Sequence, residues 1–260
     1  MLRNISRQAG MTRMRIACVG GAPVSPELLS WYNGLGVRLT EFYGLSETAG
    51  LALLPSQGGV GDSINTPLGD AKLSDSGELL VRGDHVYSHD WRDGRAEGRP
   101  VAEWFATGDS ARLESGRLHI TGRNSDRIVS RAGRSVMPSE IEAALTTSPF
   151  ISDALVVGNG REHLACLVMI DYESVESWAQ RGKVVFSGVG NLARTDAVRE
   201  LIGREIARIN DRLTDPVLKF RLIERKLEAE DLELSPVMKL RRSYVSETYK
   251  DLIESMYCKA

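Results

Sequence analysis

Four short stretches of this sequence contain the residue types that hold a nucleotide. In chain order they are Tyr43-Gly-Leu-Ser-Glu-Thr48, Thr107-Gly-Asp109, Gly122-Arg123 and Ser235-Pro-Val-Met-Lys239. An aromatic ring offers a face for a purine, and a carboxylate accepts hydrogen bonds from both hydroxyls of a ribose. A second carboxylate suits Mg²⁺, and a lysine ammonium offsets charge on a phosphate. Each stretch also has an ordinary structural explanation.

The first stretch begins at the end of a strand predicted at residues 37–43. Ligands of open α/β sheets bind beyond the carboxyl ends of the strands, which favours a site here. Tyr43 would stack on a base, Glu47 would bind Mg²⁺, and Thr48 would contact a phosphate. The alternative is a helix-capping turn with Ser46 as the cap. A hydrolase is not indicated, because the nucleophile elbow needs glycine where Thr48 stands.

The other candidate residues are equally ambiguous when each is taken alone. Asp109 fits a ribose or a β-turn. Lys239 follows the break at Ser235-Pro236, so it has either the reach to stabilise a phosphate transition state or a place in a solvated basic loop. Arg123 and Arg134 are also typical of solvated surface positions.

A small-residue stretch, Gly20-Gly21-Ala22-Pro23, lies between a predicted strand and a predicted helix. Such residues let the backbone approach an anionic ligand at a helix N-terminus, but they suit a tight βα turn equally well. The usual glycine-rich phosphate loops are absent from the sequence. His85 and His89 are the histidines with the closest spacing, and they lie in a turn-rich region that does not favour a metal site.

Composition excludes several classes of protein. The 260 residues carry a net charge of −2, which gives no signature of nucleic-acid binding. The apolar runs are too short to span a membrane, and the first residues lack the features of a secretory signal. The three cysteines, Cys18, Cys166 and Cys258, are far apart and are expected to be reduced. We expect a cytoplasmic protein, and peripheral attachment to a membrane is left open.

The order of the predicted elements indicates a mixture of α/β and α+β structure. Strands at 15–19 and 37–43, with a helix that opens at Ser25-Pro26, predict one parallel crossover unit. Residues 58–123 alternate turns with short strands, such as 78–82 and 117–121, and predict a small antiparallel unit. After a polar boundary at 124–126, the pattern predicts a compact α+β domain. Its expected elements are a hairpin at 127–137, a helix at 140–145 capped by Pro138-Ser139, strands at 154–157, 164–170 and 220–227, and helices at 198–213 and 245–256.

Taken together, the motifs resemble the adenylate-forming (AMP-binding) superfamily. Thr121-Gly-Arg-Asn-Ser-Asp-Arg-Ile-Val and Val136-Met-Pro-Ser-Glu-Ile-Glu are similar to the hinge and lid entry of that family, and Ser235-Pro-Val-Met-Lys-Leu-Arg-Arg is close to the form in long-chain fatty acyl-CoA synthetases. The resemblance runs from about residue 15 to residue 257 and corresponds to the C-terminal portion of such an enzyme. It implies a remnant of the large AMP-binding domain at 1–123, a hinge at 124–126 and a lid domain at 127–260.

The resemblance also implies roles for individual residues. Asp109, helped by Arg123, would hold the ribose, and Lys239 would serve the adenylation step. Ser125 would lie at the hinge, and Arg134 would lie on the lid loop of the thioester step. The other residues of the implied site are Gly20, Gly21, Ala22 and Pro23 along the adenine and acyl pocket, Tyr43 stacked on adenine, Gly44 at the nucleotide, Glu47 on Mg²⁺ and Thr48 at the phosphates. The substrates would be ATP, a fatty acid and coenzyme A.

The family's triphosphate-binding loop has no counterpart in this sequence, so we expect the chain to begin partway through such an enzyme. Without that loop, the isolated chain should be inactive or very weak. Three alternatives remain: a non-catalytic remnant, a half that pairs with a separate N-terminal chain, and an adenylating enzyme for another carboxylic acid. Missing strands would leave an exposed apolar edge and face near residues 1–45.

Overall fold

The computed structural model describes residues 2–21, 24, 26–55, 64–98, 102–114, 117–225, 227–228, 230–235 and 240–258. Internal contacts divide the chain into two units, Met1–Ser125 and Asp126–Ala260. This division falls within the stretch 124–126, which the sequence predicts to separate the small antiparallel unit from the α+β domain. In the described ranges, no helix is long and apolar enough to cross a membrane.

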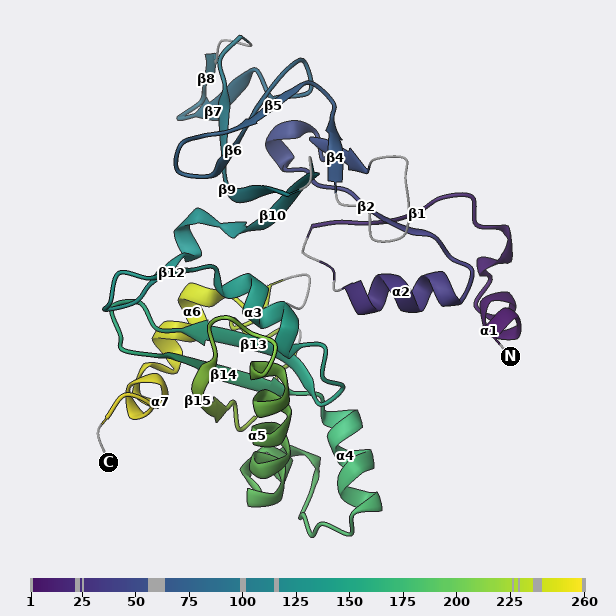
Figure 1. Ribbon diagram of the computed structural model, residues 1–260, viewed down its shortest axis with the longest axis vertical. Helices are drawn as coiled ribbons and strands as arrows, with labels where there is room; N and C mark the ends of the chain where they lie inside the picture. The colour runs from purple at the N-terminus through teal and green to yellow at the C-terminus, as the bar shows by residue number, and fades with distance from the viewer. Residues whose placement is uncertain are drawn as a thin grey trace. The chain divides into compact units, whose positions relative to one another are not determined.

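The first unit opens with the parallel crossover that the sequence predicts. Strands β1 (Ala17–Val19) and β2 (Leu39–Glu41) pair in parallel, and α2 (Pro26–Gly34) connects them (Figure 1). Helix α1 (Leu2–Gln8) and the short η1 (Met11–Arg13) precede them. β2 is shorter than predicted, because the chain beyond Glu41 turns toward β3 and Tyr43 forms an isolated bridge with Leu53. The proposed helix cap Ser25 lies outside the described residues.

Large apolar side chains are exposed in this part of the first unit. Ile16 is 79% exposed, and Trp31 on α2 is 56% exposed. Ile5, Met14 and Leu28 are also exposed. These residues confirm the predicted apolar surface near residues 1–45, and such a surface is typical of an interaction site.

The rest of the first unit is the predicted antiparallel β structure. Its main sheet has the strand order β10-β9-β6-β5. The strands are β5 (Asp70–Leu73), β6 (Glu78–Arg82), β9 (Phe105–Glu114) and β10 (Arg117–Arg123), with two flanking hairpins, β3 (Leu53–Pro55) with β4 (Ile64–Pro67) and β7 (His89–Arg92) with β8 (Arg95–Gly98). Leu79 and Val81 are buried and pack against Leu53 and Ala111, and they alternate along β6 with residues that are only partly buried. This alternation is why the strand has one buried face.

The second unit is built around a three-stranded mixed sheet. β13 (Ile151–Val157) pairs antiparallel with β14 (Leu164–Ile170), and β14 pairs parallel with β15 (Val217–Leu222). A small hairpin, β11 (Ile128–Val129) with β12 (Ser135–Val136), confirms the expected one. The helices are α3 (Pro138–Leu145), α4 (Tyr172–Arg181), α5 (Asp196–Asn210), α6 (Arg242–Thr248) and α7 (Lys250–Ser255), with the 3-10 segment η4 (Val189–Arg194) before α5.

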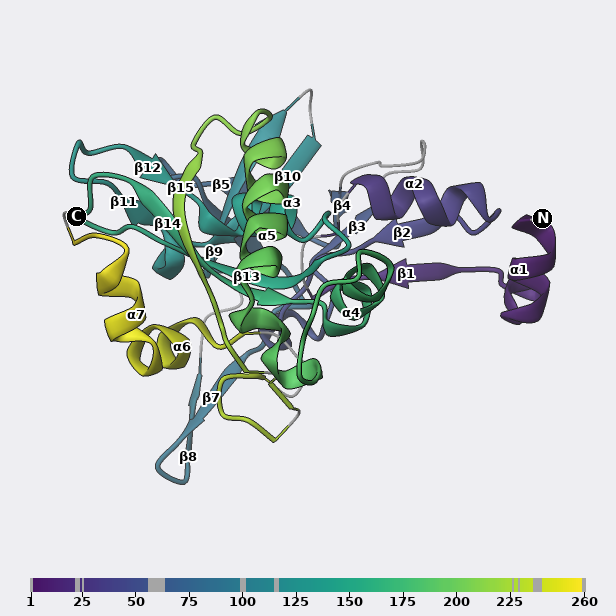
Figure 2. The same ribbon diagram turned by 90° about the horizontal axis from the view of Figure 1, so that it is seen from below.

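Both faces of the β13–β14–β15 sheet are covered. Cys166 and Val168 pack with buried residues of α3, α4 and α5, whereas Ala165 and Leu167 face a second cluster with Val245 and Met256. Figures 1 and 2 show the green helices α4 and α5 and the yellow helices α6 and α7 around this sheet. A strand that is buried on both faces is continuously apolar, as β14 is.

Several predicted boundaries in the second unit are wrong. β15 covers Val217–Leu222 instead of 220–227, and Ile223, directly after the strand, lies in the second core cluster. The last helix is split at Tyr249, whose φ of −105° and ψ of 24° interrupt it. Helix α3 begins at Pro138 with Met137 as its N-cap and no side-chain cap, so Pro138-Ser139 does not cap it. Helix α4 was not predicted.

Candidate nucleotide site

Irregular strand pairing in β9 fixes the backbone at Asp109. The register between β6 and β9 shifts between Glu78 and Leu80, and Gly108 adopts a φ of +75°, which only glycine tolerates easily. The Thr107 hydroxyl donates to the Leu79 carbonyl at 2.8 Å and accepts from the Asp109 amide at 3.1 Å. These bonds lock the turn, and Asp109 is only 5% exposed.

A second irregularity places Arg123 opposite Asp109. The pairing of β10 with β9 shifts between Ile120 and Gly122, which sets Arg123 directly across from Asp109. The Arg123 Nε atom lies 3.0 Å from Asp109 Oδ1. The arginine side chain is 54% exposed, so its charge is accessible while the carboxylate is enclosed.

Tyr43 completes the cluster from a distant part of the chain. The backbone of Tyr43 bonds to Leu53, and the phenol donates to Asp109 Oδ2 at 2.5 Å. Burial, followed by the hydrogen bond to Asp109, raises the pKa of Tyr43, so the phenol keeps its proton to a higher pH than a free tyrosine does. Both carboxylate oxygens of Asp109 thus have protein partners, and a carboxylate oxygen can accept more than one hydrogen bond.

The turn after Tyr43 is closed by its own side chains. The 3-10 segment η2 (Ser46–Thr48) has Leu45 as its N-cap, so Ser46 is not the cap. The buried Thr48 hydroxyl donates to the Leu45 carbonyl at 3.1 Å and accepts from the Leu45 amide at 2.9 Å. The hydroxyl that we expected at a phosphate is therefore used inside the turn, and this arrangement gives that role no support.

Gly44 has a packing reason of its own. A Cβ atom added there would lie 2.1 Å from the Gly50 carbonyl oxygen, so only glycine permits the close approach of the two backbones. Nothing in this geometry requires a nucleotide to explain Gly44. Its expected place beside adenine remains a prediction.

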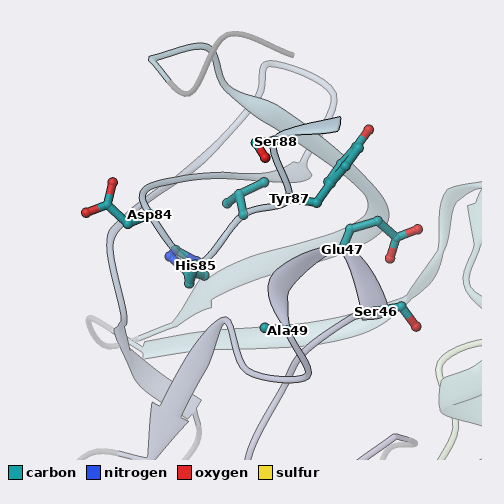
Figure 3. Close-up of a pocket in the computed structure, with 8 residues that line it drawn as sticks. Ser46, Glu47, Ala49, Asp84, His85, Tyr87 and Ser88 are labelled. Carbon is teal, nitrogen blue, oxygen red and sulfur yellow. The ribbon is translucent and has the colours of Figure 1, made fainter. Parts of the chain in front are cut away.

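Glu47 is exposed and lines an open pocket of about 380 Å³ (Figure 3). The other lining residues are Ser46, Ala49, Asp84, His85, Val86, Tyr87 and Ser88. The Tyr87 amide donates to the Glu47 carbonyl at 2.8 Å and so ties the turn to the loop before β7. In the described part of the chain, no group of three or more His, Cys, Asp or Glu residues is arranged to hold a metal ion. A single exposed carboxylate still suits Mg²⁺, which usually takes one or two carboxylates plus phosphate oxygens and water.

The remaining predicted residues lie elsewhere. Gly20 and Gly21 follow β1 and are exposed, and Ser125 is exposed at the division between the units. In the second unit, Arg134 lies between β11 and β12, and its Nε atom is 2.7 Å from Asp215 Oδ1. Ala22, Pro23 and Lys239 lie outside the described residues.

Two residues that support Asp109 had no predicted role. Thr107 stands in the Thr107-Gly-Asp109 stretch, but the sequence does not show that its hydroxyl bridges Leu79 and Asp109. Glu78 Oε1 accepts from the Gly108 amide at 2.8 Å across the sheet. Glu78 is 30 residues distant in sequence, so only the strand pairing reveals it.

Comparison with known proteins shows which family the chain resembles. Residues 125–260 match the model of the AMP-binding enzyme C-terminal domain. Over 255 residues the chain is 36% identical to "Long-chain-fatty-acid--CoA ligase FadD15" of Mycobacterium bovis, covering 94% of this chain and 42% of the relative. It is 28% identical to "Long-chain-fatty-acid--CoA ligase ACSBG1" of Bos taurus, covering 99% of this chain and 40% of the relative.

A solved structure shares the fold. The adenylation domain of the carboxylate reductase from Mycobacterium chelonae has a TM-score of 0.74 at 22% identity, covering 99% of this chain and 41% of that one. The fold is thus that of the C-terminal part of an adenylation domain. This chain belongs to the AMP-binding enzyme family, and it spans about two fifths of the length of the curated relatives it matches.

Proposed function

We propose that this chain contributes the C-terminal part of an ATP-dependent fatty acid–CoA ligase. The enzyme would join a fatty acid to AMP, release pyrophosphate, and then transfer the acyl group to the thiol of coenzyme A. The carrying observation is the convergence of Tyr43 and Arg123 on Asp109 in a chain of the AMP-binding family. Fatty acids are favoured as the substrate class because both ligases named above are long-chain-fatty-acid–CoA ligases.

In this proposal, Asp109 accepts hydrogen bonds from the ribose hydroxyls. Its two oxygens are oriented by the Tyr43 phenol and the Arg123 guanidinium before any ligand arrives, which reduces the cost of ordering the site. The Tyr43 ring offers its face to adenine, with Gly20, Gly21, Ala22, Pro23 and Gly44 as neighbours. The exposed Arg123 charge would also attract an anionic nucleotide.

The phosphate end of the site rests on Glu47 and Lys239. Glu47 is the exposed carboxylate nearest in sequence to Tyr43, and Mg²⁺ bound there would offset negative charge on the phosphate oxygens. Lys239 would stabilise the charge that builds on the α-phosphate when the fatty carboxylate attacks it. Thr48 would contact a phosphate only by giving up the hydrogen bonds of its hydroxyl to the backbone of Leu45.

The thioester step would use the second unit differently. Ser125 would act as the hinge between the units, and Arg134 would lie on the loop that faces coenzyme A in this step. One domain that presents two surfaces in turn would separate the half-reactions.

The exposed apolar residues of the first unit favour a second proposal about assembly. Ile16 directly precedes β1 and Trp31 lies on α2, where neighbouring elements of a larger α/β sheet would pack. We propose that the remaining part of an AMP-binding enzyme covers them, in the same polypeptide or in a separate one. A non-catalytic remnant and an adenylating enzyme for another acid remain alternatives.

Nucleotide binding is tested by calorimetry with AMP on the chain and on Asp109→Asn. Loss of a charged acceptor for two hydroxyls should weaken binding about 10- to 100-fold. Asp70→Asn is the matched control, because Asp70 also pairs with an arginine, Arg82, but at an exposed position of the same sheet. Equal AMP affinity of all three proteins would contradict the proposed ribose site.

Catalysis is tested by ATP–pyrophosphate exchange with palmitate. The chain alone should show background exchange, and addition of the N-terminal part of a related ligase should restore it. Lys239→Ala should abolish the restored exchange. Binding of AMP without restorable exchange would favour a non-catalytic remnant, and exchange with an aryl acid but not with palmitate would favour another adenylating enzyme.

A further inference from the structure

Arg242, the first residue of α6, contacts segments that are far apart in sequence. Its guanidinium bonds to Glu142 Oε1 on α3 and donates to the Val156 carbonyl on β13 at 2.9 Å. Its Nε atom lies 3.6 Å from Asp126 Oδ2, at the start of the second unit. The side chains of Arg242 and Glu142 are 25% and 17% exposed, so this pair is shielded from solvent, whereas Asp126 is partly exposed.

Glu142 holds the other side of this contact. Besides Arg242, its Oε1 accepts from the Val156 amide at 2.8 Å. Burial raises the pKa of Glu142, and the charge of Arg242 opposes that rise. A shielded, charge-assisted pair with backbone partners on the same strand has one well-defined geometry, because removing either partner leaves an uncompensated charge.

The residues that flank Lys239 are anchored to the same body. The Leu240 amide donates to Asp153 Oδ2 on β13 at 3.1 Å, and Leu240 forms a bridge with Leu234. The Arg241 amide donates to the Glu233 carbonyl at 2.7 Å. The buried Glu233 is paired with Arg225, whose Nη2 atom lies 2.5 Å from its Oε1. The described residues on either side of Lys239 are therefore bonded to one another and to β13.

We propose that Arg242 is a positioning residue that joins the start of the second unit, at Asp126, to the anchored residues that flank Lys239. Loosening either segment then loosens the other, although they are more than 100 residues apart in sequence. Arg242 itself touches no substrate in this proposal. The catalytic consequence rests on the proposed function, because only adenylation gives Lys239 its role, whereas the coupling is a property of the second unit alone.

Amide hydrogen exchange on the whole chain tests the coupling directly. Arg242→Lys keeps the charge but cannot reach all three partners with one planar group. We expect exchange to become about tenfold faster or more at Leu240 and Arg241 and also in segment 126–130. Arg199→Lys is the control, because Arg199 forms an exposed pair with Asp196 at 2.8 Å on α5.

Asp126→Asn tests the same link from the other end. It removes one partly exposed arm, so the unit should stay folded even if Arg242→Lys does not fold. Faster exchange at Leu240 in this variant supports the proposal. Unchanged exchange at Leu240, or a response of Arg242→Lys confined to its own segment, overturns it.

Kinetics separate this inference from the proposed function. In the complemented ATP–pyrophosphate exchange assay, Arg242→Lys should lower kcat about tenfold with little change in KM for ATP, because it misplaces Lys239 without touching the ribose site. An unchanged kcat overturns the catalytic consequence. If the wild-type protein shows no exchange, the proposed function fails, and hydrogen exchange still decides whether Arg242 couples the two segments.

Discussion

Two strands with nearly the same sequence have opposite surroundings in this molecule. Ile16-Ala-Cys-Val19 leads into and forms β1, and Leu164-Ala-Cys-Leu-Val168 begins β14. On β14, Cys166 is fully buried, whereas Cys18 on β1 is exposed. The difference lies in the neighbouring elements. β14 has a strand on each side and apolar clusters on both faces, whereas β1, in the part of the chain that the structure describes, pairs with β2 alone. An apolar sequence thus shows that a strand can be buried, and the packing partners decide whether it is.

The largest expected effect of this contrast is a difference in labelling rate between the thiols of Cys166 and Cys18. The Cys166 thiol is buried and its pKa is raised by burial, so it should not react with a thiol reagent in the native state. Cys18 should react rapidly, as should the exposed Cys258. Timed labelling followed by peptide mass spectrometry separates the three sites. Rapid labelling of Cys166 without denaturant would show that the second unit is open.

The same experiment sharpens the proposal about assembly. Addition of the N-terminal part of a related ligase should slow labelling of Cys18 and leave Cys258 unchanged. Protection of Cys258 alone would place the added protein elsewhere.

Truncation of apolar side chains should follow the same contrast. Leu167→Ala on β14 removes a fully buried side chain and should cost about 2–5 kcal/mol of unfolding free energy. Ile16→Ala next to β1 should cost less than about 0.5 kcal/mol, because Ile16 is 79% exposed. Urea unfolding measures both values. Similar losses would mean that Ile16 is buried in solution, for example by self-association, which sedimentation would detect.

Elements whose sequence patterns are local were predictable from the sequence. The stripe of α5, the strand β14 and the parallel crossover all follow from periodicity and turn residues, and the structure confirms them. The predicted bounds of β15 are wrong because this mostly exposed strand shows no apolar alternation, with only Val217 and Leu222 buried in it. Helix α4 was missed because its buried residues are few: Tyr172, Val175 and Ala179.

For the candidate site, residue types were predictable and bonding partners were not. The carboxylate at Asp109 and the basic residue at Arg123 follow from the motifs. Their pairing depends on two irregularities in the ladder, between Glu78 and Leu80 and between Ile120 and Gly122, which no local pattern specifies. The internal use of the Thr48 hydroxyl is likewise a matter of turn geometry, which the side chain type leaves open.

In the first unit, burial changes the pKa of Tyr43, whose phenol bonds to Asp109. Tyr43→Phe should cost about 1.5 kcal/mol of unfolding free energy near neutral pH, the usual value for a hydrogen bond to a charged group. Because the pKa of Tyr43 is raised in the folded state, this contribution is fully present below the unfolded pKa of about 10 and is lost as pH rises through the folded value. Urea unfolding of both proteins at several pH values measures the difference. A difference that grows above pH 10 would contradict the raised pKa.

The smallest expected effect concerns an exposed ion pair. It tests whether burial also decides how much an ion pair contributes to the unfolding free energy. Glu200 and Arg204 lie one turn apart on α5 with 4.0 Å between their charged atoms, and both are more than 60% exposed. Glu200→Ala should change the unfolding free energy by at most about 0.5 kcal/mol, since solvent and salt screen such a pair. Glu142→Ala, which leaves the shielded Arg242 without its main partner, should cost about 3–5 kcal/mol. If added salt removes the difference between Glu142→Ala and wild type, Glu142 is solvated in the native state, and the Arg242 contacts would not hold the start of the second unit to α6.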